Sequence, residues 1–180
     1  MTIPQEKLAF VRRLTWAEVF EIWQGNEALR PNWIAHFQSR GFTTWDAWRM
    51  TYAVPLGLPE REWALYEVPS PLVNVPQFRG GPFAGWVKRF YDGREAPTFA
   101  ELVQHPSIQQ HGGVLDIIAR FPAETIVTGV ALPSGVRIVE GMHRSCALAL
   151  AAARGVFITT RLYIALGSGD EEQLPVVGQG

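Results

Sequence analysis

Residues 136–164 read VRIVEGMHRSCALALAAARGVFITTRLYI, and this stretch predicts a strand, a tight turn, a helix and a second strand in direct succession. The apolar run 136–139 leads into Glu140 and Gly141. The alanine-rich segment 144–154 has the composition of a helix, which Gly155 ends. Residues 156–164 are rich in β-branched and aromatic side chains and form the strongest predicted strand.

The turn between the first strand and the helix has the chemistry of an anion site. Gly141 at this junction lets the backbone approach a ligand closely, and the free N–H groups and positive end of the following helix favour a negative charge. His143 and Arg144 add side-chain donors, and an arginine grips phosphate oxygens with two parallel hydrogen bonds. We therefore predict a phosphate or nucleotide site formed by Gly141, Met142, His143, Arg144 and Ser145.

Residues 138–144, followed by an Ala-rich helix and Gly155, resemble the core motif of the ParB/sulfiredoxin-like superfamily. In that superfamily an apolar strand, a Gly-x-His-Arg or Gly-x-Arg-Arg turn, an Ala-rich helix closed by glycine and a final strand follow one another. The resemblance covers roughly residues 113–165 and says little about the aromatic N-terminal half. It implies an α+β fold in which a helical N-terminal part packs on a small mixed sheet.

What the resemblance implies about function depends on the variable positions of the turn. In ParB-type members the turn holds the phosphates of a cytidine nucleotide. In sulfiredoxin it holds ATP phosphates and has a catalytic cysteine between the glycine and the histidine. Met142 stands at that position here, and Cys146 lies one helical turn later, so sulfiredoxin chemistry does not fit.

A third branch resembles the free-serine kinases, whose turn reads Asp-Gly-His-His-Arg and whose acidic residue serves phosphoryl transfer. Glu140 occupies the acidic position here. By this resemblance, Glu140 and His143 are the candidate catalytic residues of a nucleotide-dependent phosphotransferase or nucleotide hydrolase. ATP, ADP or CTP with Mg²⁺ would be the cofactors.

Each of these roles has a structural alternative, which the sequence leaves open. Glu140 could merely favour the start of the following helix by its charge. His143 could be a structural histidine, and Arg144 could pair with Glu140 or with Asp116. Cys146 is interpreted as a small residue that packs the helix.

The N-terminal half predicts aromatic helices. Thr15 can cap a helix with Glu18 in the capping-box position. Residues 16–23 place apolar side chains on one face, and Gly25 is expected to end the helix. A second helix is expected to open at Pro31 and close at Gly41, and a third to follow Thr44. The seven tryptophans are interpreted chiefly as core residues.

The middle of the chain is divided by prolines. Residues 60–68 fit a short helix or a strand, and residues 77–83, with Gly80 and Gly81, are expected to form an irregular loop. Thr98 can cap the next helix, and residues 113–121 predict another. Residues 125–132 and 136–139 form a predicted hairpin.

Composition limits the classes of function. The chain has 180 residues, 47% of them hydrophobic, and a formal net charge of −1, so nucleic acid is an unlikely partner. One cysteine gives no disulfide or zinc cluster, and His105 and His111 lack a third ligand, so no metal site is predicted. The apolar run 146–153 is too short to cross a membrane, and no signal peptide is evident, so a soluble cytoplasmic protein is expected.

We therefore predict a single α+β domain. Residues 1–97 are expected to form a helical and Pro-rich N-terminal subdomain, residues 98–167 the ParB/sulfiredoxin-like core, and residues 168–180 a flexible tail. The predicted function is binding of a nucleotide or another small phosphorylated ligand at residues 140–145, with phosphoryl transfer as its extension. The alternative is a noncatalytic protein-interaction module that uses the aromatic, Pro-rich surface and the loop 78–83.

Overall fold

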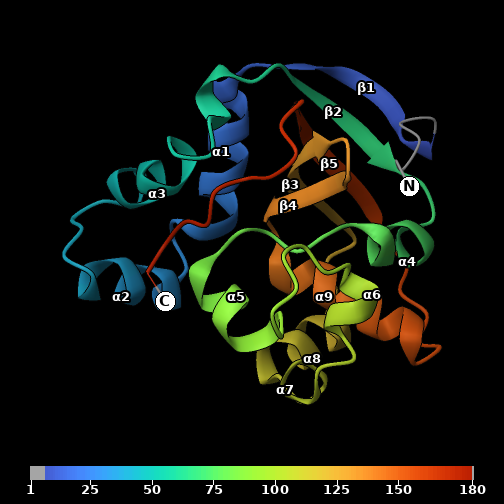
Figure 1. The fold of residues 1–180 in the computed structure, drawn as a ribbon. Helices are drawn as coiled ribbons and strands as arrows, with labels where there is room; N and C mark the ends of the chain where they lie inside the picture. The colour runs from blue at the N-terminus through green and yellow to red at the C-terminus, as the bar shows by residue number, and fades with distance from the viewer. Residues whose placement is uncertain (1–6, 180) are drawn as a thin grey trace.

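The computed structural model describes residues 7–179 and folds them into an α+β arrangement around one mixed sheet (Figure 1). Within these residues the sheet has five strands in the order β1-β2-β5-β3-β4. The strands are β1 (Ala9–Leu14), β2 (Trp63–Val68), β3 (Glu124–Leu132), β4 (Gly135–Glu140) and β5 (Arg161–Ser168). Strands β3 and β5 are parallel, and the other neighbouring pairs are antiparallel.

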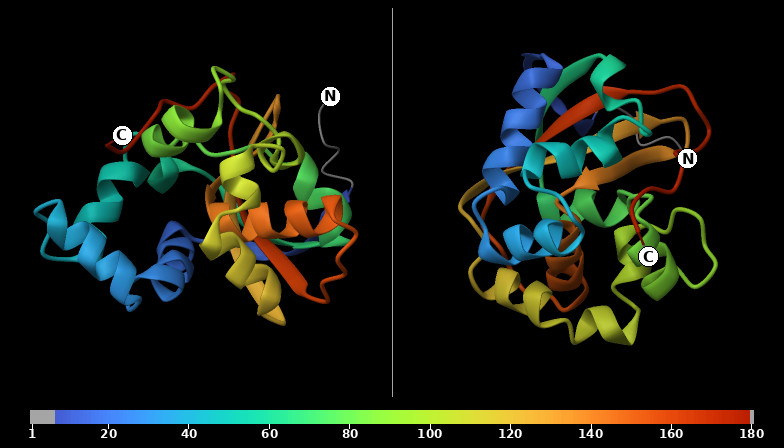
Figure 2. Two further views of the ribbon diagram at one scale, coloured as in Figure 1. Left: turned by 90° about the horizontal axis from the view of Figure 1, so that it is seen from below. Right: turned by 90° about the vertical axis from the view of Figure 1, so that its left-hand side faces the viewer.

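Helices cover both faces of the sheet (Figure 2). On one face lie α1 (Trp16–Glu27), α2 (Pro31–Ser39), α3 (Trp45–Ala53) and the 3-10 turn η2 (Leu58–Glu60). On the other lie α4 (Pro71–Asn74), η3 (Val75–Gln77), α5 (Ala84–Phe90), α6 (Phe99–Leu102), α7 (Pro106–Gln109), α8 (Gly112–Ala119) and α9 (Met142–Ala153). Each face has its own hydrophobic core, so the sheet is buried between two layers.

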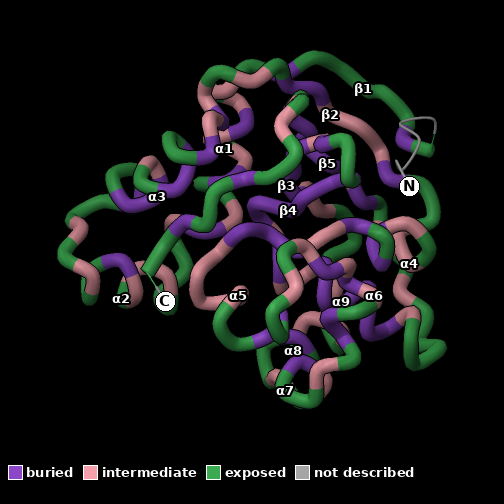
Figure 3. Tube along the Cα trace, in the orientation of Figure 1, coloured by how far each residue is buried: buried purple, intermediate pink, exposed green. Residues whose placement is uncertain are grey.

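Helix α9 lies at the centre of one layer and is buried almost all round between Ser145 and Ala151 (Figure 3). Its alanines allow close approach to α8, α6 and η3, while Leu148 and Leu150 fill the core. Burying each leucine stabilises the fold by about 1.5–3 kcal/mol. The helix therefore belongs to the core, and only its ends reach the surface.

The predicted helix starts at Thr15 and Thr98 are confirmed, but the predicted end at Gly25 is wrong, because α1 continues to Glu27. Both threonines accept a hydrogen bond from the N–H three residues on, and both pair reciprocally with a glutamate, Glu18 or Glu101. The hairpin of β3 and β4 is also confirmed. Helix α9 begins at Met142, two residues before the predicted start, because the chain turns into the helix directly after Gly141.

The pairing with neighbouring strands determines where two of the predicted strands form. Residues 63–68 form β2, because they pair with β1 on one side and with β5 on the other. The strand predicted for residues 156–164 begins only at Arg161, where pairing with Glu124 of β3 starts, and ends at Ser168. The preceding residues form a loop whose Val156 N–H bonds the carbonyl of Ala151 at 2.8 Å.

The two ends of the chain join the fold in ways that the sequence did not predict. Strands β1 and β2 belong to the same sheet as the later strands, so the sheet crosses the predicted division at residue 97. Residues 168–180 were expected to form a flexible tail, but Leu174 and Val177 are buried in the core shared with α1 and α3. The Val177 N–H bonds the carbonyl of Pro82 at 2.8 Å, which fixes this segment beside the loop 77–83.

Across residues 7–179, no helix combines the length and the apolar character needed to cross a membrane.

Candidate functional site

The turn at residues 140–142 has a backbone that only glycine accommodates. Gly141 has φ of +97°, in the left-handed region, and directly precedes α9. A Cβ atom added at Gly141 would lie 2.5 Å from Cγ1 of Val127 on β3. Both the backbone angle and the lack of space therefore require glycine, and α9 starts against the sheet without a side-chain cap.

Glu140, which is buried, and Arg144, which is half-buried, form an ion pair beside this turn. The Arg144 guanidinium contacts Oε1 of Glu140, and its Nη1 donates to Oγ1 of Thr125 at 2.5 Å and to the carbonyl of Ile126 at 3.0 Å. Nδ2 of Asn26, on α1, donates to Oε2 of Glu140 at 3.1 Å. We call these five residues the Glu140–Arg144 network. The sequence left Glu140 and Asp116 as alternative partners of Arg144, and the structure pairs it with Glu140.

The network ties four elements together and uses both carboxylate oxygens of Glu140. Burial raises the pKa of Glu140 above its usual range, while the positive charge of Arg144 opposes that shift. Glu140 is only 5% exposed. Because N–H donors occupy both oxygens, this carboxylate does not fit the role of a Mg²⁺ ligand or of a base that reaches a substrate hydroxyl.

His143 is half-buried in the first turn of α9. Its ring contacts Trp86 of α5 in an edge-on arrangement, with centroids 5.2 Å apart, and lies 5.2 Å from the ring of His111 at the start of α8. Burial, together with the charges of His111, Arg89 and Arg144, lowers the pKa of His143 to about 4. The imidazole is therefore neutral at neutral pH and offers a hydrogen bond without a positive charge.

Met142 and Ser145 point into the protein. Both are buried, and the sulfur of Met142 lies 3.2 Å from the N–H of Gly81, which donates to it. The N–H of Ser145 is used within the helix turn, where it bonds the carbonyl of Gly141 at 2.9 Å. Of the other predicted phosphate-binding side chains, Arg144 is held by its network, and His143 is half-buried beside Trp86 and His111.

The loop 77–83 covers the outer edge of β4. The N–H and carbonyl of Arg79 bond the backbone of Val136 and Ile138 at 2.8 and 3.0 Å. Tyr91 donates from its hydroxyl to the carbonyl of Gly81 at 2.5 Å, and a Cβ atom at Gly80 would lie 2.3 Å from that hydroxyl. The paired glycines therefore serve a close backbone contact that shields a sheet edge.

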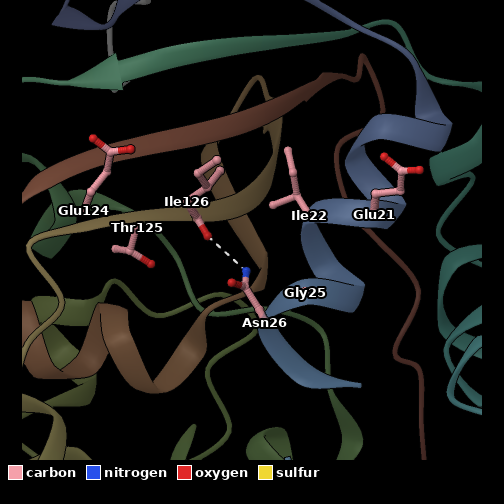
Figure 4. A pocket seen from close by; sticks show the side chains of 7 residues that line it. All are labelled: Glu21, Ile22, Gly25, Asn26, Glu124, Thr125 and Ile126. Carbon is pink, nitrogen blue, oxygen red and sulfur yellow. Dashed lines mark hydrogen bonds between the residues drawn. The ribbon is translucent and has the colours of Figure 1, made fainter. Parts of the chain in front are cut away.

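A shallow hollow of about 310 Å³ adjoins the network on the side of α1 (Figure 4). It is lined by Glu21, Ile22, Gly25, Asn26, Glu124, Thr125 and Ile126. Figure 4 shows the exposed carboxylates of Glu21 and Glu124 on opposite sides and the Asn26 amide directed at the Ile126 carbonyl, 3.2 Å away. The two exposed carboxylates make the hollow acidic.

Sequence reasoning missed a second buried ion pair, in the aromatic layer. Arg49 of α3 donates from Nε and Nη2 to the two carboxylate oxygens of Glu27, both at 2.7 Å. Its guanidinium carbon lies 3.8 Å from the ring centroid of Trp48 and within 5.3 Å of those of Trp23, Trp33 and Tyr52. No spacing rule in the sequence pairs Glu27 with Arg49, because α2 lies between them.

The other side chains considered as metal ligands or reactive groups have structural roles. His105 and His111 each accept an N–H bond through Nδ1 at a helix start, from Ser107 and Val114. In the part of the chain that the structure describes, no three His, Cys, Asp or Glu side chains are grouped as metal ligands. Cys146 is fully buried, and burial raises the pKa of its thiol, which makes it a packing residue.

Comparison of the chain with protein-family models, with curated proteins and with solved structures found no match.

Proposed function

We propose that this chain binds a small phosphorylated ligand, such as a nucleotide, at the N-terminal end of α9. The observation that carries the proposal is the uncapped start of this 12-residue helix, which follows Gly141 in a left-handed conformation. An uncapped helix start presents N–H groups and a partial positive charge to an anion. The ParB/sulfiredoxin-like resemblance of the turn supports the same class of ligand.

Side chains around the helix start favour the same ligand. Arg89 of α5 is exposed and close enough to His143 for its charge to lower the pKa of that histidine. The rings of His143 and His111 lie next to each other, with centroids 5.2 Å apart. We assign Arg89 the charge-assisted contact to a phosphate and His143 a neutral hydrogen bond.

Arg144 and Glu140 have an indirect role in this proposal. Their buried pair holds the turn in place, so that the N–H groups of the first turn keep a fixed direction. The burial of Glu140 favours ligand binding over phosphoryl transfer, because a general base must reach the proton it accepts. The burial of Phe78, Gly80 and Gly81 likewise disfavours the loop 78–83 as a protein-docking surface.

Calorimetric titration with ATP, ADP, CTP and inorganic phosphate, each with and without Mg²⁺, tests the proposal. At least one of these ligands should bind, and Arg89→Ala should weaken its binding by about tenfold, the effect of losing roughly 1.4 kcal/mol of a charge-assisted contact. Arg13→Ala, which removes an exposed arginine on β1, is the matched control and should leave the affinity unchanged. The proposal fails if none of the ligands gives heat, or if Arg89→Ala binds as tightly as the control.

A further inference from the structure

Arg137 on β4 is a buried arginine that lacks a carboxylate partner. The residue is only 2% exposed. Within residues 7–179 its side chain makes one hydrogen bond, from Nε to the carbonyl of Gly80 at 2.7 Å, and no ion pair with a carboxylate. A buried charge is costly unless an opposite charge and further hydrogen bonds compensate it. The Nη groups of Arg137 therefore need an acceptor that the described chain does not supply.

Two other arginines show how this chain pairs such charges internally. Arg49 is buried and donates to both carboxylate oxygens of Glu27. Arg144 is half-buried and pairs with Glu140. Arg137 is more deeply buried than either of them, yet its guanidinium has no such partner among the described residues. A counter-charge from outside the chain would satisfy it.

Arg79 brings a second positive charge to the same place. Residues 79 and 137 are partners in a parallel β-bridge, which sets the two arginines side by side where the loop 77–83 covers β4. Arg79 is half-buried, and its Nε and Nη1 donate to the carbonyls of Ser134 and Ala96 at 2.9 and 2.7 Å. Both acceptors are neutral, and the nearby carboxylate of Glu101 is held in the cap of α6. Like charges on paired residues repel each other, so the bridge favours an anion between them.

The other ionisable groups near Arg137 leave this charge largely uncompensated. Burial lowers the pKa of Arg137, and the charge of Arg79 adds to that shift, whereas Tyr91 and Glu95 oppose it. Burial also raises the pKa of Tyr91, so its hydroxyl stays neutral and donates to the loop carbonyl of Gly81. Glu95 is exposed and accepts a hydrogen bond from Nε2 of Gln173 at 2.8 Å instead of from an arginine.

The guanidinium of Arg137 is not sealed from solvent. Among the residues that the structure describes, the fully buried side-chain nitrogen and oxygen atoms without a hydrogen-bond partner are Nε1 of Trp23 and Oγ1 of Thr128. The Nη atoms of Arg137 have no acceptor either but are not fully buried, so they keep contact with solvent. A small ion can reach them, whereas a protein side chain would have little room.

We propose that Arg137 and Arg79 together bind a small oxyanion with two negative charges, such as a phosphate group, where the loop 77–83 meets β4. The Nη groups of Arg137 hold two of its oxygens, because a guanidinium offers parallel donors to an oxyanion. Two negative charges balance the two arginines, whereas a single carboxylate would balance one. The proposal is independent of the phosphate site proposed at the start of α9.

Thermal unfolding of the full chain in phosphate-free buffer, with added inorganic phosphate or glycerol 3-phosphate, tests the proposal. Sodium chloride keeps the ionic strength constant. Phosphate should raise the unfolding midpoint, because a ligand that binds only the folded state stabilises it. Arg79→Gln should weaken the binding by about tenfold. Arg13→Ala, which removes an exposed arginine on β1, is the matched control and should respond as the wild type does.

Arg137→Met separates this site from the one at α9. This variant needs no counter-charge, so it should fold without phosphate and should lose the rise in midpoint that Arg89→Ala keeps. If Arg137→Met fails to fold, Arg79→Gln at its half-buried position decides the question. In NMR spectra of the wild type, phosphate should shift the side-chain Nε–H signals of Arg79 and Arg137, and Arg89→Ala should leave these shifts unchanged.

Three outcomes would overturn the proposal. The first is a rise in midpoint with phosphate that Arg79→Gln and Arg137→Met keep in full, or that only Arg89→Ala loses. The second is stabilisation by acetate equal to that by phosphate at the same ionic strength, which would contradict the class of ligand. The third is no response to phosphate together with a lower midpoint for Glu95→Gln, which would make Glu95 the counter-charge of Arg137.

Discussion

At the scale of single residues, the candidate site depends on which side chains turn inward. The sequence correctly grouped Glu140, Gly141, His143 and Arg144 at one turn, because a strand, a glycine and a helix in succession dictate that grouping. The sequence did not decide which of these side chains are buried, because their burial depends on α1 and β3, which are distant in the chain. Asn26 and Thr125 complete the network, and nothing near them in the sequence indicates this role.

Glu140→Gln is predicted to destabilise the fold by about 3 kcal/mol, because removing one partner leaves the Arg144 guanidinium buried without its counter-charge. Urea unfolding monitored by tryptophan fluorescence measures the change. The double variant Glu140→Gln/Arg144→Met should recover most of the loss. An unchanged midpoint for Glu140→Gln would show that the pair does not hold the turn.

His143 is predicted to make the protein less stable in mild acid. Its folded-state pKa of about 4 lies below the value of 6.5 expected in the unfolded chain, so between these pH values the unfolded state binds the extra proton. Stability is complete above about pH 6.5 and falls with decreasing pH, with a contribution of up to about 1.4 kcal/mol per pH unit from this one group. Unfolding of wild type and His143→Gln from pH 7 to pH 4 measures it. Parallel pH profiles for the two proteins would contradict the assignment.

At the scale of elements, local signals predicted helix starts better than strands. Thr15, Thr44 and Thr98 cap helices as expected, because a cap is decided within four residues. Strand β1 was not predicted: all its residues except Leu14 are exposed, so it lacks the alternation of a half-buried strand, and pairing with β2 defines it. The loop before Arg161 has the apolar composition of a strand, but strand pairing starts only at Arg161.

The start of α9 is predicted to depend on Gly141. Gly141→Ala should cost about 2 kcal/mol or more, because the new methyl group meets Val127 and the backbone keeps a positive φ. Gly25→Ala is the matched control, since nothing lies within 4 Å of its Cβ position in α1, and it should stabilise the protein by about 0.5–1 kcal/mol. Thermal unfolding compares the two variants. Equal effects would mean that the turn tolerates a side chain.

At the scale of the whole molecule, the α+β class was predicted from the resemblance and from the succession of helix and strand signals, but the neighbours in the sheet were not. The order β1-β2-β5-β3-β4 brings the first and last parts of the chain into one sheet, and long-range packing decides such pairing. The same applies to residues 168–179, whose Gly-rich and acidic composition predicts a tail although Leu174 and Val177 are buried.

Amide NMR shifts test whether the backbone N–H groups at the start of α9 bind a phosphate group, as we propose. On addition of the nucleotide that binds in calorimetry, the amide signals of Met142, His143 and Arg144 should shift most, together with that of Arg89. The amides of Gly25 and Asn26 beside the acidic hollow should move little. Shifts concentrated at the hollow, or none at the start of α9, would contradict the account.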